Sequence, residues 1–351
     1  MSVTMVPESS FEAPARPDQA VERAPGGQRS LLVATLALGV IAPIVLLLHR
    51  YLPDGQKLLA RPASGLAWWF QPYPLLLECL FAASWIVAGA AGLWPRFRPW
   101  VWHYGPLVGA ALAILGLWDL ITRKLNWMPL PYFPGPATVL QALLDDRAVL
   151  FDSAWHSLRL LLCGYALGLL SGLISGLLMG WFRRCRYWGT PGMKLIGPIP
   201  ATALIPLAMS LFSNAFLSGA VLIALAVWFP VTMLTMSGIA NVPVAYFDVA
   251  RTLGAGRLYL IFRVAVPAAL PSIFIGLFMG LLTSFLTLMV AEQFGVKSGL
   301  GFYLEWQRGY AEYANVYAAI LIMAVFFSTI LTVLFKVRDR VLAWQRGVIR
   351  W

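Results

Sequence analysis

Residues 238–274 read GIANVPVAYFDVARTLGAGRLYLIFRVAVPAALPSIF, and this stretch decides the fold class. It leaves one apolar segment, crosses the polar decamer DVARTLGAGR and returns to apolar sequence through two prolines. Pro243 suits the first turn of a helix, Asn241 suits its N-cap, and Gly254 suits the left-handed residue that ends it. The pattern predicts a short helix over 244–253 that connects two long apolar helices.

The rest of the chain is as apolar as the flanks of this loop. Of its 351 residues, 60% are hydrophobic and only 12% are charged, whereas soluble domains carry about 25% charged residues. This composition excludes a soluble protein with a large core. The net charge of +11 does not indicate a nucleic-acid partner, because in a membrane protein the positions of Lys and Arg matter more than their sum. The three cysteines and three histidines share no disulfide or metal-ligand spacing, so no metal site is predicted.

A helix that crosses a bilayer needs about 20 mostly apolar residues. Eight segments meet this requirement, and we therefore predict an all-α polytopic membrane protein with about eight transmembrane helices. The segments are 31–49, 74–94, 103–121, 154–181, 193–212, 216–239, 268–291 and 315–336. The fifth contains Pro198, Pro200 and Pro206. Either a kinked span beside a pathway or an irregular packed helix fits these prolines.

The chain divides by composition into four regions. Residues 1–30 are rich in Pro, Glu, Ala and Arg and lack an apolar period, which predicts a disordered cytoplasmic tail. Residues 31–95 hold two transmembrane helices, and the first is interpreted as an anchor rather than a cleaved signal peptide. Residues 96–337 hold the other six helices, and 338–351 form a basic cytoplasmic tail.

Lys and Arg set the orientation in the membrane, because they accumulate in cytoplasmic loops. With both termini in the cytoplasm, most of the 26 basic residues fall in cytoplasmic segments. This orientation places the decamer of the opening stretch inside the cell.

Segment 154–181 also carries a regular row of glycines. They recur every four residues and therefore share one face of a helix: Gly164, Gly168, Gly172, Gly176 and Gly180. Such a face lets a neighbouring helix approach closely. The row fits either close packing or a surface that slides during a conformational change.

The sequence lacks the motifs of an enzyme. The nearest match to a phosphate-binding loop, FGVKSGLG at 294–301, does not have the required spacing. We therefore expect no catalytic residues, and no ATP or other cofactor bound by this chain itself.

The opening stretch resembles the "EAA" loop of permease subunits of ATP-binding-cassette (ABC) importers. Asp248, Val249 and Ala250 stand where Glu-Ala-Ala would be, Gly254 is the glycine of the motif, and Pro267 ends it. Three further segments, YFPGPATVLQALL, GPIPATALIPLAMSLF and MVAEQFGVKSGLGFYL, are similar in the same order to motifs of the nitrate/taurine/sulfonate/bicarbonate class of these importers.

The resemblance implies a binding-protein-dependent type I importer in the bacterial cytoplasmic (inner) membrane. Residues 96–337 would be its six-helix permease core, 241–267 its coupling loop, and 31–95 two extra helices. The implied partners are a separate cytoplasmic ATPase that binds ATP, a periplasmic or lipid-anchored solute-binding protein, membrane lipid and a second copy of the permease in a homodimer. The solute would be small, polar and anionic, such as nitrate, a sulfonate, taurine or bicarbonate. The residues implied to couple to the ATPase are Asp248, Val249, Ala250, Arg251, Gly254, Ala255, Arg257 and Pro267.

The candidate residues for the translocation path and its gate are Ser210, Thr283, Ser284, Thr287, Glu292 and Gln293. Thr283 and Thr287 lie four apart with Ser284 beside them, so one helix face presents hydroxyls. The alternative is that these hydroxyls bond their own backbone or a neighbouring helix. Because a carboxylate would repel an anion, Glu292 is predicted to hold the outer gate or the binding-protein contact.

Two other classes of protein remain open at this point. A self-contained secondary transporter or channel would carry inverted repeats and buried charge pairs along its path, and the sequence shows no clear repeat. A structural membrane scaffold would need no coupling helix.

Overall fold

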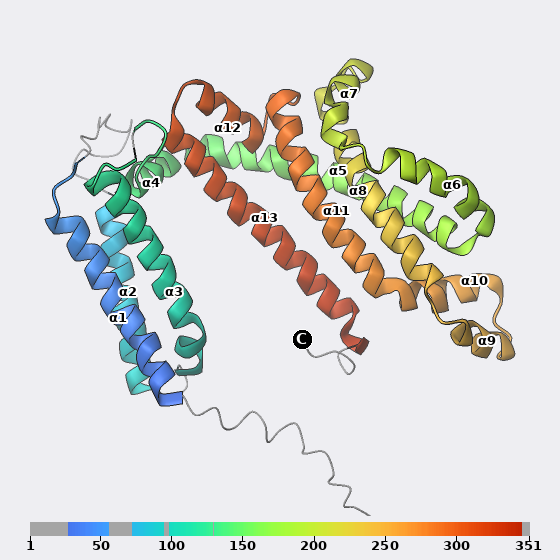
Figure 1. Ribbon diagram of the computed structural model, residues 1–351, viewed down its shortest axis with the longest axis horizontal. Helices are drawn as coiled ribbons and strands as arrows, with labels where there is room; N and C mark the ends of the chain where they lie inside the picture. The colour runs from blue at the N-terminus through green and yellow to red at the C-terminus, as the bar shows by residue number, and fades with distance from the viewer. Residues whose placement is uncertain (1–26, 56–71, 95–97, 129, 346–351) are drawn as a thin grey trace, which may run out of the picture. The chain divides into compact units, whose positions relative to one another are not determined.

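The computed structural model describes residues 27–55, 72–94, 98–128 and 130–345, and these residues are helical almost throughout (Figure 1). The predicted tail, up to residue 26, and the final residues 346–351 lie outside the described residues. The chain divides into two compact units. The N-terminal unit comprises residues 1–60 and 68–127, and the C-terminal unit comprises 61–67 and 128–351.

The N-terminal unit is built from three helices. These are α1 (Gly27–Tyr51), α2 (Pro72–Leu93) and α3 (Arg98–Asp119), which continues as the π-helical turn η3 (Leu120–Lys124). Helix α1 packs on both others. A Cβ at Gly116 of α3 would lie 2.5 Å from Cγ2 of Val45 in α1, so this glycine allows the two helices their close approach. The third predicted span thus packs with the first two, and its membership of a six-helix permease core over 96–337 stays a prediction.

One end of this unit holds a network of charged groups that the sequence analysis did not predict. The Lys124 ammonium donates three hydrogen bonds, to the carbonyls of His49 (2.6 Å) and Leu52 (2.7 Å) and to Oδ1 of Asp54 (2.7 Å). Arg123 reaches the other oxygen of Asp54 at 2.7 Å. Nδ1 of His49 lies 2.8 Å from Oδ2 of Asp119, and both side chains are buried. The network joins the end of α1 and the loop after it to the end of α3.

The C-terminal unit contains the remaining helices. Helix α8 lies between α5 and α11 and packs along both (Figure 1). In chain order the elements are α4 (Pro136–Asp145), α5 (Arg147–Trp181), α6 (Arg183–Ile196), η4 (Ala201–Leu204), α7 (Ile205–Leu211), α8 (Ala215–Ala240), α9 (Val244–Thr252), α10 (Arg257–Tyr259), η5 (Leu260–Ala265), α11 (Val266–Phe294), α12 (Leu300–Gly309), α13 (Tyr313–Val341) and η6 (Ala343–Gln345).

Among the described residues, six helical spans are long and apolar enough to cross a membrane. They correspond to α2, α3, α5, α8, the run from α10 to α11, and α13. Of the first predicted span, the part from Gly39 to Tyr51 is apolar and helical but shorter. The polytopic all-α class predicted from the sequence is confirmed.

The fifth predicted span, 193–212, is not one helix. The chain bends by 80° between α6 and the pair η4–α7. Helix α6 begins at Arg183, ten residues before the predicted start, in sequence that had been assigned to a loop. Pro200 is extended, with φ −61° and ψ 129°, and prolines remove the N–H groups that a continuous helix needs. The helix is therefore interrupted where the prolines lie, and a position of this break beside a pathway stays a prediction.

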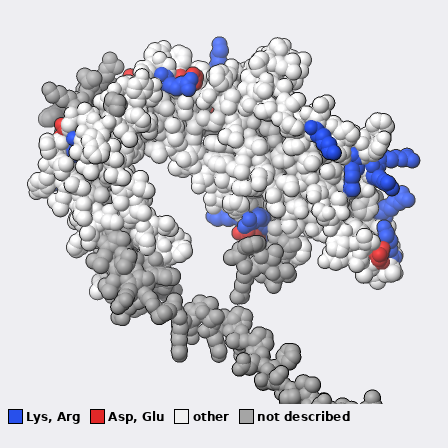
Figure 2. Space-filling model, in the orientation of Figure 1, with Lys and Arg blue, Asp and Glu red and all other residues white. Residues whose placement is uncertain are grey.

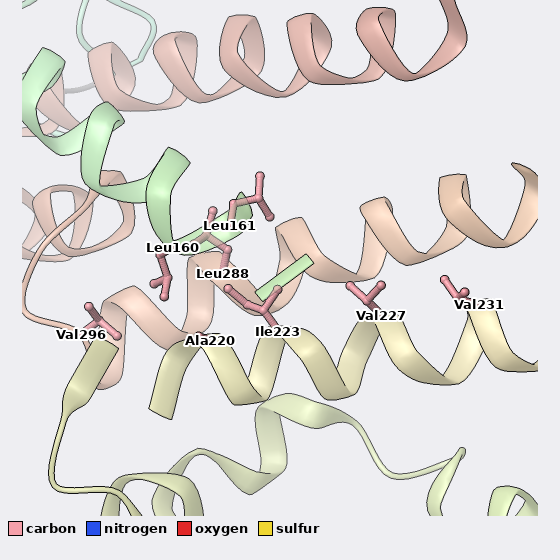
Figure 3. Close-up of a cluster of buried hydrophobic side chains, with 8 residues drawn as sticks. All are labelled: Leu160, Leu161, Ala220, Ile223, Val227, Val231, Leu288 and Val296. Atoms are coloured by element: carbon pink, nitrogen blue, oxygen red, sulfur yellow. The ribbon is translucent and has the colours of Figure 1, made fainter. Parts of the chain in front are cut away.

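The glycine row of α5 is a packing surface against α8. A Cβ added at Gly168 would lie 2.5 Å from the carbonyl oxygen of Ala224, and one at Gly176 would lie 2.6 Å from Cβ of Thr235. Close packing, one of the two interpretations of the row, is confirmed. The core beside it combines side chains of α5, α8 and α11 with one from the turn after α11, and Figure 3 shows them directed into the space between these helices: Leu160, Leu161, Ala220, Ile223, Val227, Val231, Leu288 and Val296.

Candidate coupling surface and translocation path

The predicted short helix exists as α9, but its start differs in detail. Pro243, with φ −57° and ψ 132°, occupies the N-cap position, and the helix runs from Val244 to Thr252. Asn241, predicted as the N-cap, instead caps the end of α8 and donates from Nδ2 to Oγ of Ser237 at 3.3 Å. The prediction for Asn241 was therefore wrong. Because the proline ring fixes φ and carries no N–H, the helix begins directly after it.

The end of α9 follows the prediction for Gly254. Its φ is +81°, which is the left-handed region that glycine adopts without strain. Its N–H bonds the carbonyl of Arg251 at 2.9 Å, and the N–H of Ala255 bonds the carbonyl of Ala250 at 3.0 Å. This pair of bonds is the Schellman pattern. It turns the chain sharply away from α9 towards Arg257, the first residue of α10.

One face of α9 is fixed to the membrane helices. The ring of Phe247 meets Trp181 at the end of α5 edge-on, with centroids 5.7 Å apart. Phe247 also packs against a buried cluster that includes Ile239 of α8 and Ala269 in the first turns of α11. A displacement of α9 would therefore act on the ends of three long helices.

The opposite face of α9 is open. Val249 is 62% exposed, and Leu253, the C-cap residue of the helix, is 83% exposed. Asp248 and Arg251 of the same helix form an exposed ion pair 3.0 Å long. Figure 2 shows Lys and Arg gathered over α6 and around α9 and α10. The structure brings the predicted coupling residues together on α9, its cap and the start of α10, except Pro267, which lies in the first turn of α11.

The predicted path residues lie on α7 and α11, and their hydroxyl groups donate to main-chain carbonyls. Thr283 donates across to Ala226 of α8 at 3.0 Å. Ser284 and Thr287 are buried and donate within α11, and Ser210 donates within α7. These bonds are the alternative that the sequence analysis left open, and a role in the path stays a prediction.

Glu292 and Gln293 lie at the end of α11 that is farther from α9. The side chain of Met209, next to Ser210, packs in a cluster with Val290 of α11. Ser210 therefore lies near the same end of α11 as Glu292. The Glu292 side chain is 1% exposed and fully hydrogen-bonded to two other helices.

Sequence reasoning missed a polar group between α5 and α8. Oγ of Ser175 lies 2.7 Å from Oγ1 of Thr232 and accepts a 3.0 Å hydrogen bond from the indole N–H of Trp228. The signal was present, because Ser171 and Ser175 each directly precede a glycine of the packed row. They place hydroxyls beside the face where α8 comes closest.

Comparison with known proteins identifies the family. The family model described as "binding-protein-dependent transport system inner membrane component" matches residues 165–344, more than half of the chain. The chain belongs to this family. It is therefore the permease component of an ABC importer and a multi-pass membrane protein. Permeases of this kind work with ATPase and substrate-binding partners.

Relatives extend the match beyond these residues. The chain is 30% identical over 234 residues to the putative aliphatic sulfonates transport permease protein SsuC of Bacillus subtilis, covering 66% of this chain and 84% of the relative. It is 29% identical over 226 residues to the taurine transport system permease protein TauC of Escherichia coli, covering 62% and 82%. Among solved structures, an inward-facing MetNI methionine ABC transporter matches with a TM-score of 0.48 at 15% identity, covering 56% of this chain and 97% of the other.

Proposed function

We propose that this permease forms the path for a small anionic solute and that α9 couples it to a separate cytoplasmic ATPase. In this proposal two copies of the permease associate in the bacterial inner membrane, with both termini of each copy in the cytoplasm. A solute-binding protein delivers the solute from the other side, and ATP is bound by the ATPase rather than by this chain.

The observation that carries the coupling role is the open apolar face of α9. Val249 and Leu253 are among the exposed apolar side chains, and three charged residues lie close to them in the sequence: Asp248, Arg251 and Arg257. An apolar patch rimmed by polar groups is typical of a protein contact. The nearby concentration of Lys and Arg supports a cytoplasmic position, where lipid tails do not cover this face.

The anchored face of α9 supports the direction of coupling. Because Phe247 packs on the ends of α5, α8 and α11, movement of a docked ATPase would tilt these helices as packed bodies. A ligand that binds one arrangement better than the other shifts the population between them. Closure of the ATPase around ATP would provide that difference, and a central site would open alternately to each side.

The solute class rests on the relatives named for aliphatic sulfonates and taurine. A sulfonate needs hydrogen-bond donors along its path rather than a deep cage, because the binding protein provides most of the selectivity. Under this proposal Ser210, Thr283 and Gln293, which keep exposed surface, line the path, whereas Ser284 and Thr287 are buried in the helix packing. Uptake should then be inhibited by alkanesulfonates and not by neutral analogues of the same size.

The test replaces Leu253 with Glu in the importer reconstituted with its ATPase and binding protein. Because Leu253 is 83% exposed, the variant should insert and fold but lose the ATPase in co-purification and lose sulfonate uptake. Val341→Glu, at the end of α13 and 42% exposed, is the matched control and should keep both. Leu253 is a better position than Gly254, whose φ of +81° would strain any other residue. Normal uptake by Leu253→Glu would rule out this face as the coupling surface.

A further inference from the structure

The end of α11 farther from α9 is built around one carboxylate. Oε1 of Glu292 accepts a 2.7 Å hydrogen bond from the hydroxyl of Ser157 in α5. Oε2 accepts a 2.8 Å hydrogen bond from the N–H of Gly301 in the first turn of α12. The same Ser157 oxygen accepts the N–H of Leu300 at 2.9 Å. Three helices therefore meet at the Glu292 side chain, and two first-turn N–H groups of α12 receive partners that a helix start otherwise lacks.

The backbone is shaped to let the carboxylate reach this position. Gly299 has φ +100°, and a Cβ there would lie 2.3 Å from the carboxyl carbon of Glu292. A Cβ at Gly301 would lie 2.9 Å from Cβ of Glu292. Only residues without side chains fit at these two positions, so the turn between α11 and α12 is matched to the carboxylate.

The Glu292 carboxyl group fits the donors around it. It receives one donor on each oxygen, and carboxylate oxygens accept hydrogen bonds. An amide at the same position would keep an acceptor for only one of these two donors, so the hydrogen bond with Ser157 would have to reverse. An ionisable group buried at the end of a membrane helix is rare and costly, so its presence indicates a requirement beyond packing.

Helix α12 is held at a second point. The Tyr303 hydroxyl donates to Oδ2 of Asp146 at 2.5 Å, and Nδ2 of Asn315 lies 3.4 Å from the same oxygen. Asp146 lies between α4 and α5, and Asn315 lies in α13. Thus α12 is bound to α5 and α11 at its start and, through Tyr303, to the residue between α4 and α5.

Helix α9 and helix α12 lie at the two ends of α11 (Figure 1). We propose that Glu292 and Ser157 form a latch that makes α5, α11 and α12 move as one body. A displacement applied at α9 would then rotate α5, α11 and α12 together. Without the latch, α11 would slide past α5 and α12 would not move. Glu292 is a positioning residue in this proposal, and the proposal rests on the coupling role of α9.

The test uses the assembled importer in proteoliposomes, with a single cysteine at position 310 in a background without Cys79, Cys163 and Cys185. Tyr310 is 65% exposed near the end of α12. The rate of labelling by a thiol reagent is measured with and without a non-hydrolysable ATP analogue, beside uptake and ATP hydrolysis. With the latch intact, the nucleotide should change the labelling rate. In the Glu292→Gln variant, the nucleotide should no longer change the labelling rate at position 310. Uptake should also be lost, while ATP hydrolysis persists.

Ser157→Ala removes one hydroxyl and covers the case in which Glu292→Gln does not fold. Ser153→Ala, a buried serine one turn earlier in α5, is the matched control and should behave as wild type. The latch is overturned if Ser157→Ala and Glu292→Gln keep wild-type uptake and nucleotide response, or if position 310 never responds to nucleotide. If the wild-type complex shows no ATP-dependent uptake at all, it is the proposed function that fails.

Discussion

Asp54 lies in the loop after α1, and its carboxyl group forms ion pairs with Arg123 and Lys124 at the end of α3 and η3. Burial raises the pKa of its carboxyl group, but hydrogen bonds and charge from Lys124 and Arg123 outweigh this effect, and the pKa lies below its ordinary value of 3.8. A lowered pKa in the folded state means that the ionised form stabilises the fold. This stabilisation is complete above the ordinary value and is lost as pH falls through the lowered one.

Replacing Asp54 with Asn should therefore destabilise the protein in a pH-dependent way. At pH 7 the variant should unfold at a lower temperature than wild type. The loss in free energy of unfolding should be at most about 1 kcal/mol, because the Asp54 carboxylate is partly exposed and solvent screens its charge. The difference should shrink as the pH is lowered well below 3.8. Thermal unfolding of the detergent-solubilised protein measures both. A difference that stays constant across this range would show that Asp54 acts through packing alone.

At the scale of elements, the sequence predicted what local chemistry determines. The end of α9 at Gly254 was predictable because few residues adopt a φ of +81°. The break in the fifth span was predictable from its prolines, but its 80° size depends on what α6 and α7 pack against. The grouping of α3 with α1 and α2 could not be predicted, because apolar segments of similar length carry no information about their neighbours.

The same contrast holds for side chains: unusual residues can be found in the sequence, but their distant hydrogen-bond partners cannot. Glu292 was singled out as a candidate for the outer gate or the binding-protein contact because a carboxylate would repel an anion in the path. Its partners, Ser157 and the N–H groups of Leu300 and Gly301, are distant in sequence or belong to the main chain. The Lys124 network was missed for the same reason, since its acceptors are the main-chain carbonyls of His49 and Leu52 and a loop aspartate.

The two ends of α8 and α11 provide a test of orientation. Ser237 lies at the α9 end and Ser298 in the turn between α11 and α12. If α9 is cytoplasmic, a cysteine at 298 should react with an impermeant thiol reagent added outside intact cells. A cysteine at 237 should react only after permeabilisation. Both are introduced in a background without the three native cysteines, and the reverse pattern of labelling would invert the proposed topology.

At the scale of the whole molecule, the family's features lie in the C-terminal unit. The family match, residues 165–344, falls entirely within it. So do α9, the Glu292 latch and all the predicted path residues. The N-terminal unit has its own packing and its own charged network. Its role is therefore expected to lie in support or contact rather than in the choice of solute.

The boundary between the units predicts how the chain tolerates truncation. Removing residues 1–127 takes away the whole N-terminal unit together with residues 61–67 of the C-terminal unit, and the Arg183–Arg186 segment after α5 still directs insertion. This variant should insert, assemble and keep its solute preference in uptake competition. Removing only 1–95 leaves α3 without α1 and α2, on which it packs, and leaves Asp119 and Lys124 without their partners His49 and Asp54. This shorter deletion should therefore give less monodisperse protein in detergent. A stable 1–95 deletion beside an unstable 1–127 deletion would instead support a six-helix core beginning at residue 96.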